Sequence, residues 1–374
     1  MPRIHGGRAV LLRIATLVAS CLLGAIAAEG VLRLRYARID FLKPRLVADD
    51  VLVHRIAPYS GGHDAWGFRN RAVPDRADII AIGDSLTYGY SATAAESWPS
   101  WLARATGAAV YNLGLGGYGP ADYLYLLDTR APGLHPSLAI VGVYFGNDLL
   151  DAVTRVYARE HWRDLRQGGP GHTGPPSPPL DPASAEGWLE AHSMLFRLVE
   201  ESVVGQTINR FADRAGATRD GACSLESGPP FPTVFTPHDR LKALDLSSPE
   251  IREGLEITLT LLTRMHQSAD RAGMRVIILL LPTKESVYDG LLDGASDRAC
   301  LDVVRRVVAN ERTARERIID RLAAEHTDYV DALPALRAAA ARNTERLFLR
   351  SGDSHPNGNG YRIIAADVQR RLKP

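Results

Sequence analysis

The chain has 374 residues, of which 45% are hydrophobic and 23% charged, as is usual for a globular protein with a sizeable core. Its 44 basic and 43 acidic residues give a net charge of +1, so no overall field attracts nucleic acid and no such partner is expected. The length suits one large α/β domain with insertions or two smaller domains.

The N-terminal segment departs from this average composition. Residues 14–28, IATLVASCLLGAIAA, carry no charge and follow three arginines. A bilayer span needs about 20 apolar residues, and snorkelling of Arg13 together with the apolar residues 30–32 supplies the missing length. Four interpretations remain: an uncleaved signal anchor, a signal peptide cleaved at the small residues 25–27, a lipobox ending at Cys21, or a buried helix.

We expect residues 1–32 to form a membrane anchor or signal segment and residues 33–75 to form an irregular stem. Basic residues after the segment oppose retention of the N-terminus in the cytoplasm, although long domains cross the membrane despite such charges. The expectation is therefore a single-pass protein of the inner (cytoplasmic) membrane with the bulk of the chain on the extracytoplasmic side. The alternative is secretion after signal cleavage.

From residue 76 onward, short apolar runs alternate with amphipathic stretches. Strands are predicted at residues 79–82, 109–113, 138–143, 276–281, 329–330 and 347–349. Helices are predicted around residues 98–102, from Pro120 onward, and over residues 249–272, 303–324 and 359–372. Strands that alternate with helices imply a three-layer α/β/α fold with a mainly parallel sheet covered on both faces.

The alternation stops between residues 151 and 246. Residues 167–187 hold six prolines and five glycines and cannot belong to a sheet, and a helical stretch is predicted over residues 188–212. We interpret residues 151–246 as an insertion in a domain that covers residues 76–374. It is either a surface excursion or a lid.

Beyond Cys21 the chain has only Cys223 and Cys300. In an exported domain these two cysteines either pair or are unrelated thiols. Their spacing matches no metal site, and the chain has no H-E-x-x-H, Walker A or G-x-S-x-G motif. No metal is expected.

Four loops with unusual residues follow predicted strands: residues 83–85, 112–117, 146–148 and 353–355. The carboxyl ends of parallel strands share one edge of a sheet, where ligands bind. The tripeptide Gly-Asp-Ser occurs twice among these loops. Ser85 stands where a strand turns into a helix, and the helix N-terminus favours an anionic oxygen there. Ser354 instead stands between Asp353 and His355, the two residues that a serine elsewhere would need as orienting carboxylate and base.

Residues 114–119, GLGGYG, match the dinucleotide motif G-x-G-x-x-G after a strand and before a helix. Such a site needs an acidic residue about 20 positions further on. The next predicted strand instead ends at Gly146-Asn147, and the motif does not follow the first strand of the sheet. A nucleotide site is therefore rejected, and no cofactor is expected.

The four loops resemble, in the same order, the sequence blocks of the SGNH hydrolases, also called the GDSL family. The resemblance spans most of residues 64–372. It implies that Ser85 is the nucleophile and His355 the general base. It also implies that the N–H groups of Ser85 and Gly117 and the amide of Asn147 stabilise an oxyanion. Together with the N-terminal segment, it is similar to the membrane-tethered bacterial members of the family.

One position departs from the commoner family pattern. The aspartate that usually precedes the histidine by three residues is replaced by Gly352, and Asp353 precedes His355 by only two. On a loop either spacing brings a carboxylate to the imidazole. Asp353 is therefore either the third member of a triad or a bystander to a Ser-His dyad.

The resemblance implies a serine esterase that acts through an acyl-enzyme on ester groups, O-acetyl groups among them, of cell-envelope carbohydrate. The alternatives are an O-acyltransferase to a glycan, which uses the same acyl-serine, and a non-catalytic glycan-binding envelope protein. The presence of Ser85, Asn147 and His355 favours an enzyme, because a binding module needs none of them.

Overall fold

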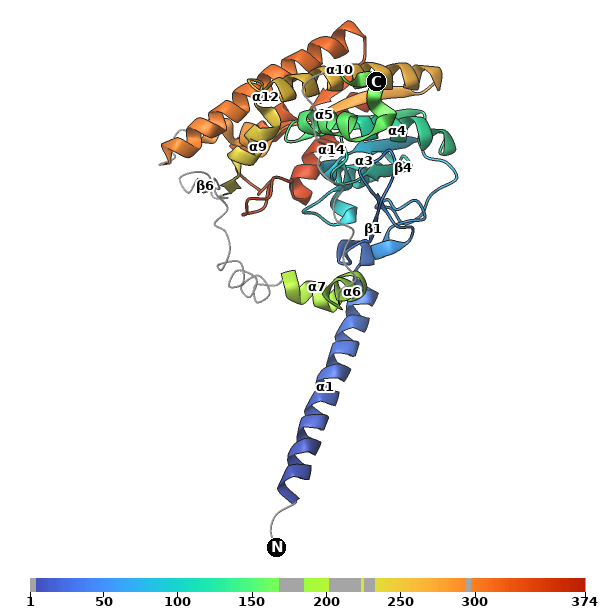
Figure 1. Cartoon of the computed structure of the whole chain (residues 1–374), viewed down its shortest axis with the longest axis vertical. Helices are drawn as coiled ribbons and strands as arrows, with labels where there is room; N and C mark the ends of the chain where they lie inside the picture. Colours follow the sequence, from blue (N-terminus) through green and yellow to red (C-terminus); the bar gives the residue numbers. More distant parts are fainter. Residues whose placement is uncertain (1–4, 168–184, 202–222, 225–232, 293–296, 374) are drawn as a thin grey trace.

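A five-stranded parallel sheet forms the centre of the molecule (Figure 1). The computed structural model describes residues 5–167, 185–201, 223–224, 233–292 and 297–373. All neighbouring strands in the order β4-β3-β5-β8-β9 run parallel. These strands are β3 (Ile79–Gly83), β4 (Val110–Gly114), β5 (Leu138–Tyr144), β8 (Arg275–Leu281) and β9 (Asp328–Asp331). The predicted parallel sheet is confirmed, and every residue of β3 and β5 is buried, as in a sheet covered on both faces.

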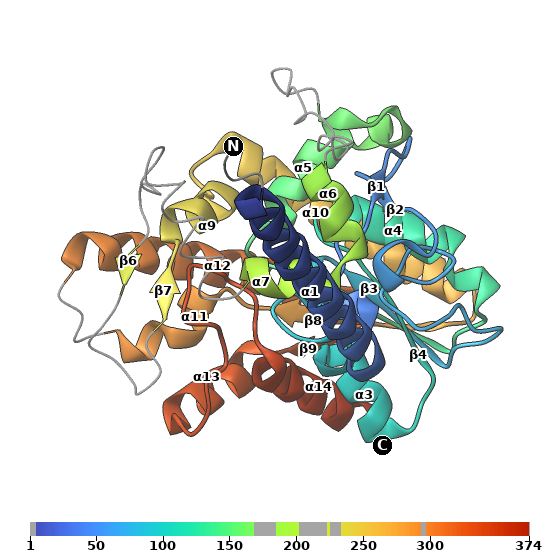
Figure 2. The same ribbon diagram turned by 90° about the horizontal axis from the view of Figure 1, so that it is seen from below.

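Successive residues of the central strands point to opposite faces of the sheet. Ile80 and Ile82 pack in one hydrophobic cluster, and Ile79 and Ala81 pack in another, which is the two-residue period of a strand. The first cluster includes helices α4 (Pro120–Thr129), α5 (Asp148–Ala158) and α10 (Pro249–Arg271). The second includes α3 (Trp98–Thr106), α13 (Leu333–Arg342) and α14 (Gly358–Leu372), and α12 (Arg298–Ala324) contributes to both. Figure 2 shows these two helical layers with the strands between them, so the three-layer α/β/α fold is confirmed.

The predicted strand at residues 347–349 is wrong. Phe348 makes only an isolated antiparallel bridge with Pro356, and the segment lies between α13 and α14 outside the sheet. A run of three apolar residues does not distinguish a strand from a buried loop, and here Leu347 and Phe348 are buried in a core cluster without pairing in the sheet.

The remaining described elements lie around this core. The stretch before β3 forms a short antiparallel pair, β1 (Leu46–Val47) with β2 (Arg55–Ile56), and also contributes Leu52 and Phe68 to the core. Between α5 and α10 the described elements are α6 (Ala185–His192), α7 (Met194–Glu201), β6 (Cys223–Ser224), β7 (Val234–Phe235) and α9 (Pro237–Leu244). The predicted helix over residues 188–212 is thus a pair of helices up to Glu201, and its remainder lies outside the described residues.

The N-terminal helix α1 (His5–Arg35) projects from the domain (Figure 1). Its residues Leu12–Arg35 are long and apolar enough to cross a membrane, with a mean hydropathy of 1.9 and no buried share. The helix is therefore not a core helix, whereas a membrane anchor and a signal sequence both fit these properties. Cys21, on this helix, is free and Cys300 is disulfide-bonded. The side chain of Cys223 lies outside the described residues, so its pairing stays a prediction.

Helices α5 and α10 pack so closely that adding a single methyl group between them should push them apart. A Cβ atom added to Gly254 on α10 would lie 2.0 Å from the Leu149 carbonyl oxygen of α5. We predict that Gly254→Ala costs roughly 1–3 kcal/mol of folding free energy through overpacking and lowers the melting temperature of the full chain in detergent by several degrees. Gly290→Ala is the control, because a Cβ there meets no atom within 4 Å. Equal melting temperatures for the two variants would contradict the close packing.

Candidate active site

The carboxyl ends of β3, β4 and β5 meet at a topological switch point. From β3 the chain moves to β4 on one side and then returns to β5 on the other side of β3. The crevice that opens between such strands is where α/β sheets of this order bind ligands. Ser85 directly follows β3, Gly117 follows β4, and Asn147 follows β5. The sheet therefore places three of the predicted residues at the edge formed by the carboxyl ends of its strands.

Ser85 is the first residue of the short helix α2 (Ser85–Tyr88). Asp84 caps this helix, because its Oδ1 accepts a hydrogen bond of 2.9 Å from the Leu86 N–H. The turn from β3 into α2 leaves no room for a side chain at position 83, because a Cβ on Gly83 would lie 2.1 Å from the Thr87 hydroxyl. The backbone thus fixes Ser85 at the start of the helix, and its side chain is mostly buried.

His355 links Ser85 to Asp353. Its Nε2 lies 2.8 Å from Ser85 Oγ, and its Nδ1 lies 2.5 Å from Asp353 Oδ1. The same Oδ1 accepts the backbone N–H of His355 at 3.0 Å. An aspartate two residues before the histidine therefore reaches Nδ1 because the backbone turns back within this loop. Serine, imidazole and carboxylate form one continuous hydrogen-bonded chain.

Asp353 is surrounded by groups that keep it ionised. Burial would raise the pKa of its carboxyl group, but the hydrogen bond and charge of His355 and the hydroxyl of Ser91 hold that pKa well below its usual range. Ser91 donates to Oδ2, the oxygen that does not contact the imidazole. Ser91 itself has a φ of 63°, an uncommon conformation for a residue other than glycine. The carboxylate is charged throughout the neutral pH range.

A buried lysine holds the backbone of the same loop. Lys284, on α11 (Lys284–Tyr288), is fully buried. Its Nζ donates to the carbonyl oxygens of Asp353 at 2.6 Å and of Ser351 at 3.1 Å. Burial lowers the pKa of Lys284 to about 8. Sequence reasoning missed this residue, although it lies just after β8 and hence at the same edge of the sheet.

The loop that contains Gly117 is held by a buried ion pair. The Arg155 side chain donates to the Gly117 carbonyl oxygen at 3.2 Å and contacts Asp122 at 3.1 Å. Gly117 has a φ of +80°, which favours glycine because a side chain is strained there. Its N–H has no hydrogen-bond partner in the described part of the chain and is available for a ligand.

Asn147 lies beside Asp84 at the end of β5. Burial raises the pKa of Asp84, while the Asn147 amide and Ser85 hydroxyl favour its charged form. The neighbouring Asp148 accepts the Tyr144 N–H and the Tyr123 hydroxyl, both at 2.9 Å. Each of the two aspartates accepts a backbone N–H from within four residues, as aspartates in turns do, and each also accepts a side-chain hydroxyl. Asn147 and Ser85 are connected through Asp84, whereas Gly117 stands on the adjoining loop.

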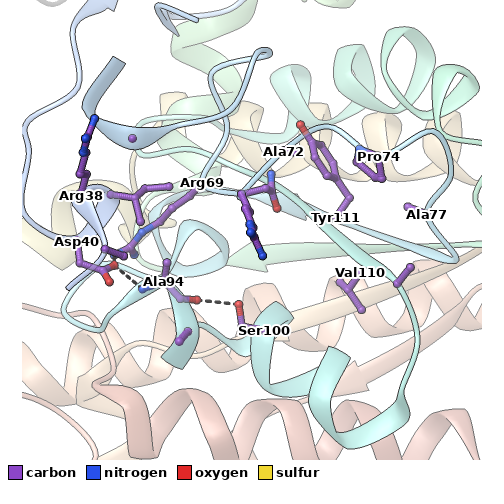
Figure 3. Close-up of a pocket in the computed structure, with 17 residues that line it drawn as sticks. Arg38, Asp40, Arg69, Ala72, Pro74, Ala77, Ala94, Ser100, Val110 and Tyr111 are labelled. Atoms are coloured by element: carbon purple, nitrogen blue, oxygen red, sulfur yellow. Dashed lines mark hydrogen bonds and ion pairs between the residues drawn. The ribbon is translucent and has the colours of Figure 1, made fainter. Parts of the chain in front are cut away.

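Two neighbouring cavities share Asp40 and Arg69 in their linings, and neither is lined by Ser85, His355 or Asp353. A cavity of about 580 Å³ is lined by Tyr90 and Ser91. The Tyr90 ring lies 5.3 Å from the imidazole of His355, and Ser91 contacts Asp353. A larger cavity of about 730 Å³, drawn in Figure 3, lies around Arg69 and Tyr111 and is lined by neither Tyr90 nor Ser91. The smaller cavity is therefore the one next to the candidate site.

The chain belongs to the GDSL-like lipase/acylhydrolase family, whose model matches residues 81–363. The assignment to the SGNH/GDSL hydrolases is thereby confirmed, and the matching model describes a family of lipases and acylhydrolases. A search of curated proteins found no match.

Several solved structures are similar to this chain. A G-D-S-L lipolytic protein from Desulfitobacterium hafniense DCB-2 is 16% identical with a TM-score of 0.40, covering 79% of this chain and 98% of that one. An extracellular lipase from Streptomyces rimosus is 13% identical with a TM-score of 0.42, covering 79% and 100%. An acetylxylan esterase from Geobacillus stearothermophilus is 11% identical with a TM-score of 0.35, covering 80% and 94%.

The contacts of Lys284 predict a role in positioning the 351–355 loop. Lys284→Met removes the donor that binds the carbonyl oxygens of Ser351 and Asp353, so His355 should shift relative to Ser85. We expect kcat for an aryl acetate to fall roughly 10- to 100-fold, as small misplacements of reacting groups do, with little change in KM. The control is Lys242→Met, since Lys242 is an exposed lysine on α9. An unchanged kcat in Lys284→Met would show that the loop holds its position without the lysine.

Proposed function

We propose that this protein is a serine esterase in which Ser85 is the nucleophile, His355 the general base and Asp353 the group that orients the imidazole. The observation that carries the proposal is the hydrogen-bonded chain from Ser85 Oγ through His355 to Asp353, with contacts of 2.8 and 2.5 Å. A serine is a weak nucleophile until an adjacent base removes its proton, and the base in turn needs an orienting partner. All three components are present in contact.

The reaction has two halves. Nε2 of His355 takes the proton of Ser85 as Oγ attacks the ester carbonyl carbon, and the imidazolium then protonates the leaving alkoxide. The product is an acyl ester on Ser85 and a free alcohol. Water then attacks the acyl carbonyl while His355 again accepts a proton, and collapse of the second tetrahedral intermediate releases the acid and restores Ser85.

Asp353 acts as the third member of a triad. A carboxylate on Nδ1 holds the tautomer in which Nε2 can accept a proton, and it stabilises the imidazolium that forms. The low pKa of Asp353, which follows from its contacts with His355 and Ser91, supports this role because a protonated carboxyl group could not provide it.

The oxyanion is stabilised by the N–H groups of Ser85 and Gly117 and by the amide of Asn147. Ser85 begins a helix, where unpaired N–H groups point toward the incoming negative charge. The available N–H of Gly117 and the position of Asn147 at the end of β5 support the other two assignments. Such donors are effective because they are fixed before the charge develops.

The substrate class is an ester, and we propose O-acyl groups, acetyl among them, on cell-envelope carbohydrate. The support is α1, whose length and apolar character suit a single anchor in the cytoplasmic membrane with the catalytic domain on the extracytoplasmic side. Transfer of the acyl group from Ser85 to a sugar hydroxyl is the competing outcome, since only the acceptor differs. Assays of acyl esters with and without sugar acceptors distinguish hydrolysis from transfer.

The two Gly-Asp-Ser copies allow a matched test of the nucleophile. Ser85→Ala should lower kcat by roughly 10⁴-fold or more, the usual loss when a triad member is removed, and should abolish labelling by a fluorophosphonate probe. Ser354→Ala should retain labelling and most of the activity, because that hydroxyl is given no part in the reaction. Labelling that survives Ser85→Ala and disappears with Ser354→Ala would overturn the assignment.

Asn147→Ala tests the oxyanion assignment. Removing one such donor typically lowers kcat by roughly 10²–10³, and we expect that loss with an unchanged circular dichroism spectrum. Fluorophosphonate labelling of this variant should slow but still occur, since Ser85 and His355 remain. Normal kcat would mean that Asn147 serves only the turn after β5.

A further inference from the structure

Helices α6 and α7 lie outside the three layers of the α/β/α domain, beside the end of α1 that joins the domain (Figures 1 and 2). They also contact the stem: Lys43 forms an ion pair of 3.0 Å with Glu190 of α6, and Arg197 of α7 donates to the Phe41 carbonyl at 3.1 Å. The two helices therefore have a fixed position between α1 and the globular domain.

Glu29 of α1 fixes the N-terminus of α7. Its carboxylate accepts the Ser193 hydroxyl at 3.1 Å, the Met194 N–H at 3.1 Å and the Leu195 N–H at 2.8 Å, and it forms an ion pair of 2.7 Å with Arg33. A carboxylate at a helix N-terminus compensates the unpaired N–H groups there. The start of α7 therefore lies level with Glu29 along α1.

That level coincides with the expected boundary of the bilayer. The apolar part of α1 begins at Leu12, and about 20 residues cross the hydrocarbon core, which brings the boundary near residue 31. Glu29 lies six residues before the end of α1 at Arg35, about 9 Å along the helix axis. A charged residue at this depth is costly unless it is paired, and its partners come from Arg33 and α7.

The side chains around this level suit a lipid–water interface. The apolar side chains exposed here include Leu34 (86% exposed), Trp188 (61%), Val31 (59%), Tyr36 (57%), Val199 (53%) and Leu198 (44%). Tryptophan and tyrosine are enriched at membrane interfaces. The exposed arginines at positions 33, 35, 38 and 45 complement anionic headgroups. In water, such an apolar set would be unfavourable.

We propose that α6 and α7 lie in the lipid–water interface of the membrane that α1 spans, forming a second attachment of the domain to the bilayer. The proposal rests on α1 being a membrane span, which is part of the proposed function. Trp188 stacks on His192 at 4.8 Å between ring centroids, and the His192 carbonyl accepts from Arg33 at 2.5 Å. The indole is thus tied to the last turns of α1 at the boundary.

This attachment brings the membrane to the side of the domain that carries the active site. Arg197 of α7 lines the same cavity as Tyr90 and Ser91, which contact His355 and Asp353. Helices that lie in the interface are therefore separated from the catalytic loops by one cavity. The domain is held in one orientation and does not turn freely on a tether.

Tryptophan quenching by brominated lipid tests the proposal in the full chain. The vesicles contain phosphatidylcholine and phosphatidylglycerol, with or without bromine on the acyl chains. No tryptophan occurs in α1, so quenching reports on the domain. We expect the tryptophan emission of the wild type to be weaker in brominated vesicles than in vesicles without bromine. We expect Trp188→Phe to show no such decrease. The control Trp162→Phe removes a buried tryptophan. The fraction of its emission that brominated lipid quenches should exceed that of the wild type, because fewer unquenched tryptophans remain.

Cys21 separates failure of this inference from failure of the membrane span. It lies within the span and is free, so a water-soluble maleimide should label it in denaturant but not in vesicles. Protection of Cys21 with equal quenching of wild type, Trp188→Phe and Trp162→Phe would overturn the interfacial position of α6 and α7 while leaving the span. Labelling of Cys21 in vesicles would overturn both. Neither readout depends on esterase activity.

Discussion

The hydrogen bond between Ser85 Oγ and His355 Nε2 joins the first strand of the sheet to the last loop of the chain, and the site depends on it. Ser85 is fixed by β3 and by the cap from Asp84. His355 is fixed from the other side, because α14 follows its loop and packs against α3. Two residues distant in sequence thus meet only when α14 is packed beside α3 on one face of the sheet. Catalytic geometry and core packing are therefore coupled in this fold.

The groups around this bond hold the loop at two further points. Lys284 binds the backbone carbonyls of the loop, and Ser91 binds the carboxylate of Asp353. Both contacts come from elements that follow strands, so the sheet again sets their positions. Burial disfavours the charged forms of both Asp353 and Lys284. For Asp353 the contacts with His355 and Ser91 offset the free-energy cost of burying the charge.

Much of the fold was predictable from sequence because buried parallel strands are continuous apolar runs, as at residues 276–281. The loops at residues 83–85 and 146–148 were predictable as neighbours because they follow such strands. The strand at residues 347–349 was not, since three apolar residues fit a buried loop equally well. Ser91 could not be found, because its contact with Asp353 depends on a left-handed backbone conformation and on tertiary packing. The position of α7 depends on Glu29, a single charge whose partners on α7 are about 165 residues away.

The central claim is that an acyl group passes through Ser85. Full-length protein mixed with an aryl acetate and quenched in acid during the first turnover can be digested and analysed by peptide mass spectrometry. The account predicts a burst of phenolic product and an acetyl group on the peptide that contains Ser85. An acetyl group on the peptide with Ser354, or a linear time course with no acetylated serine, would contradict it.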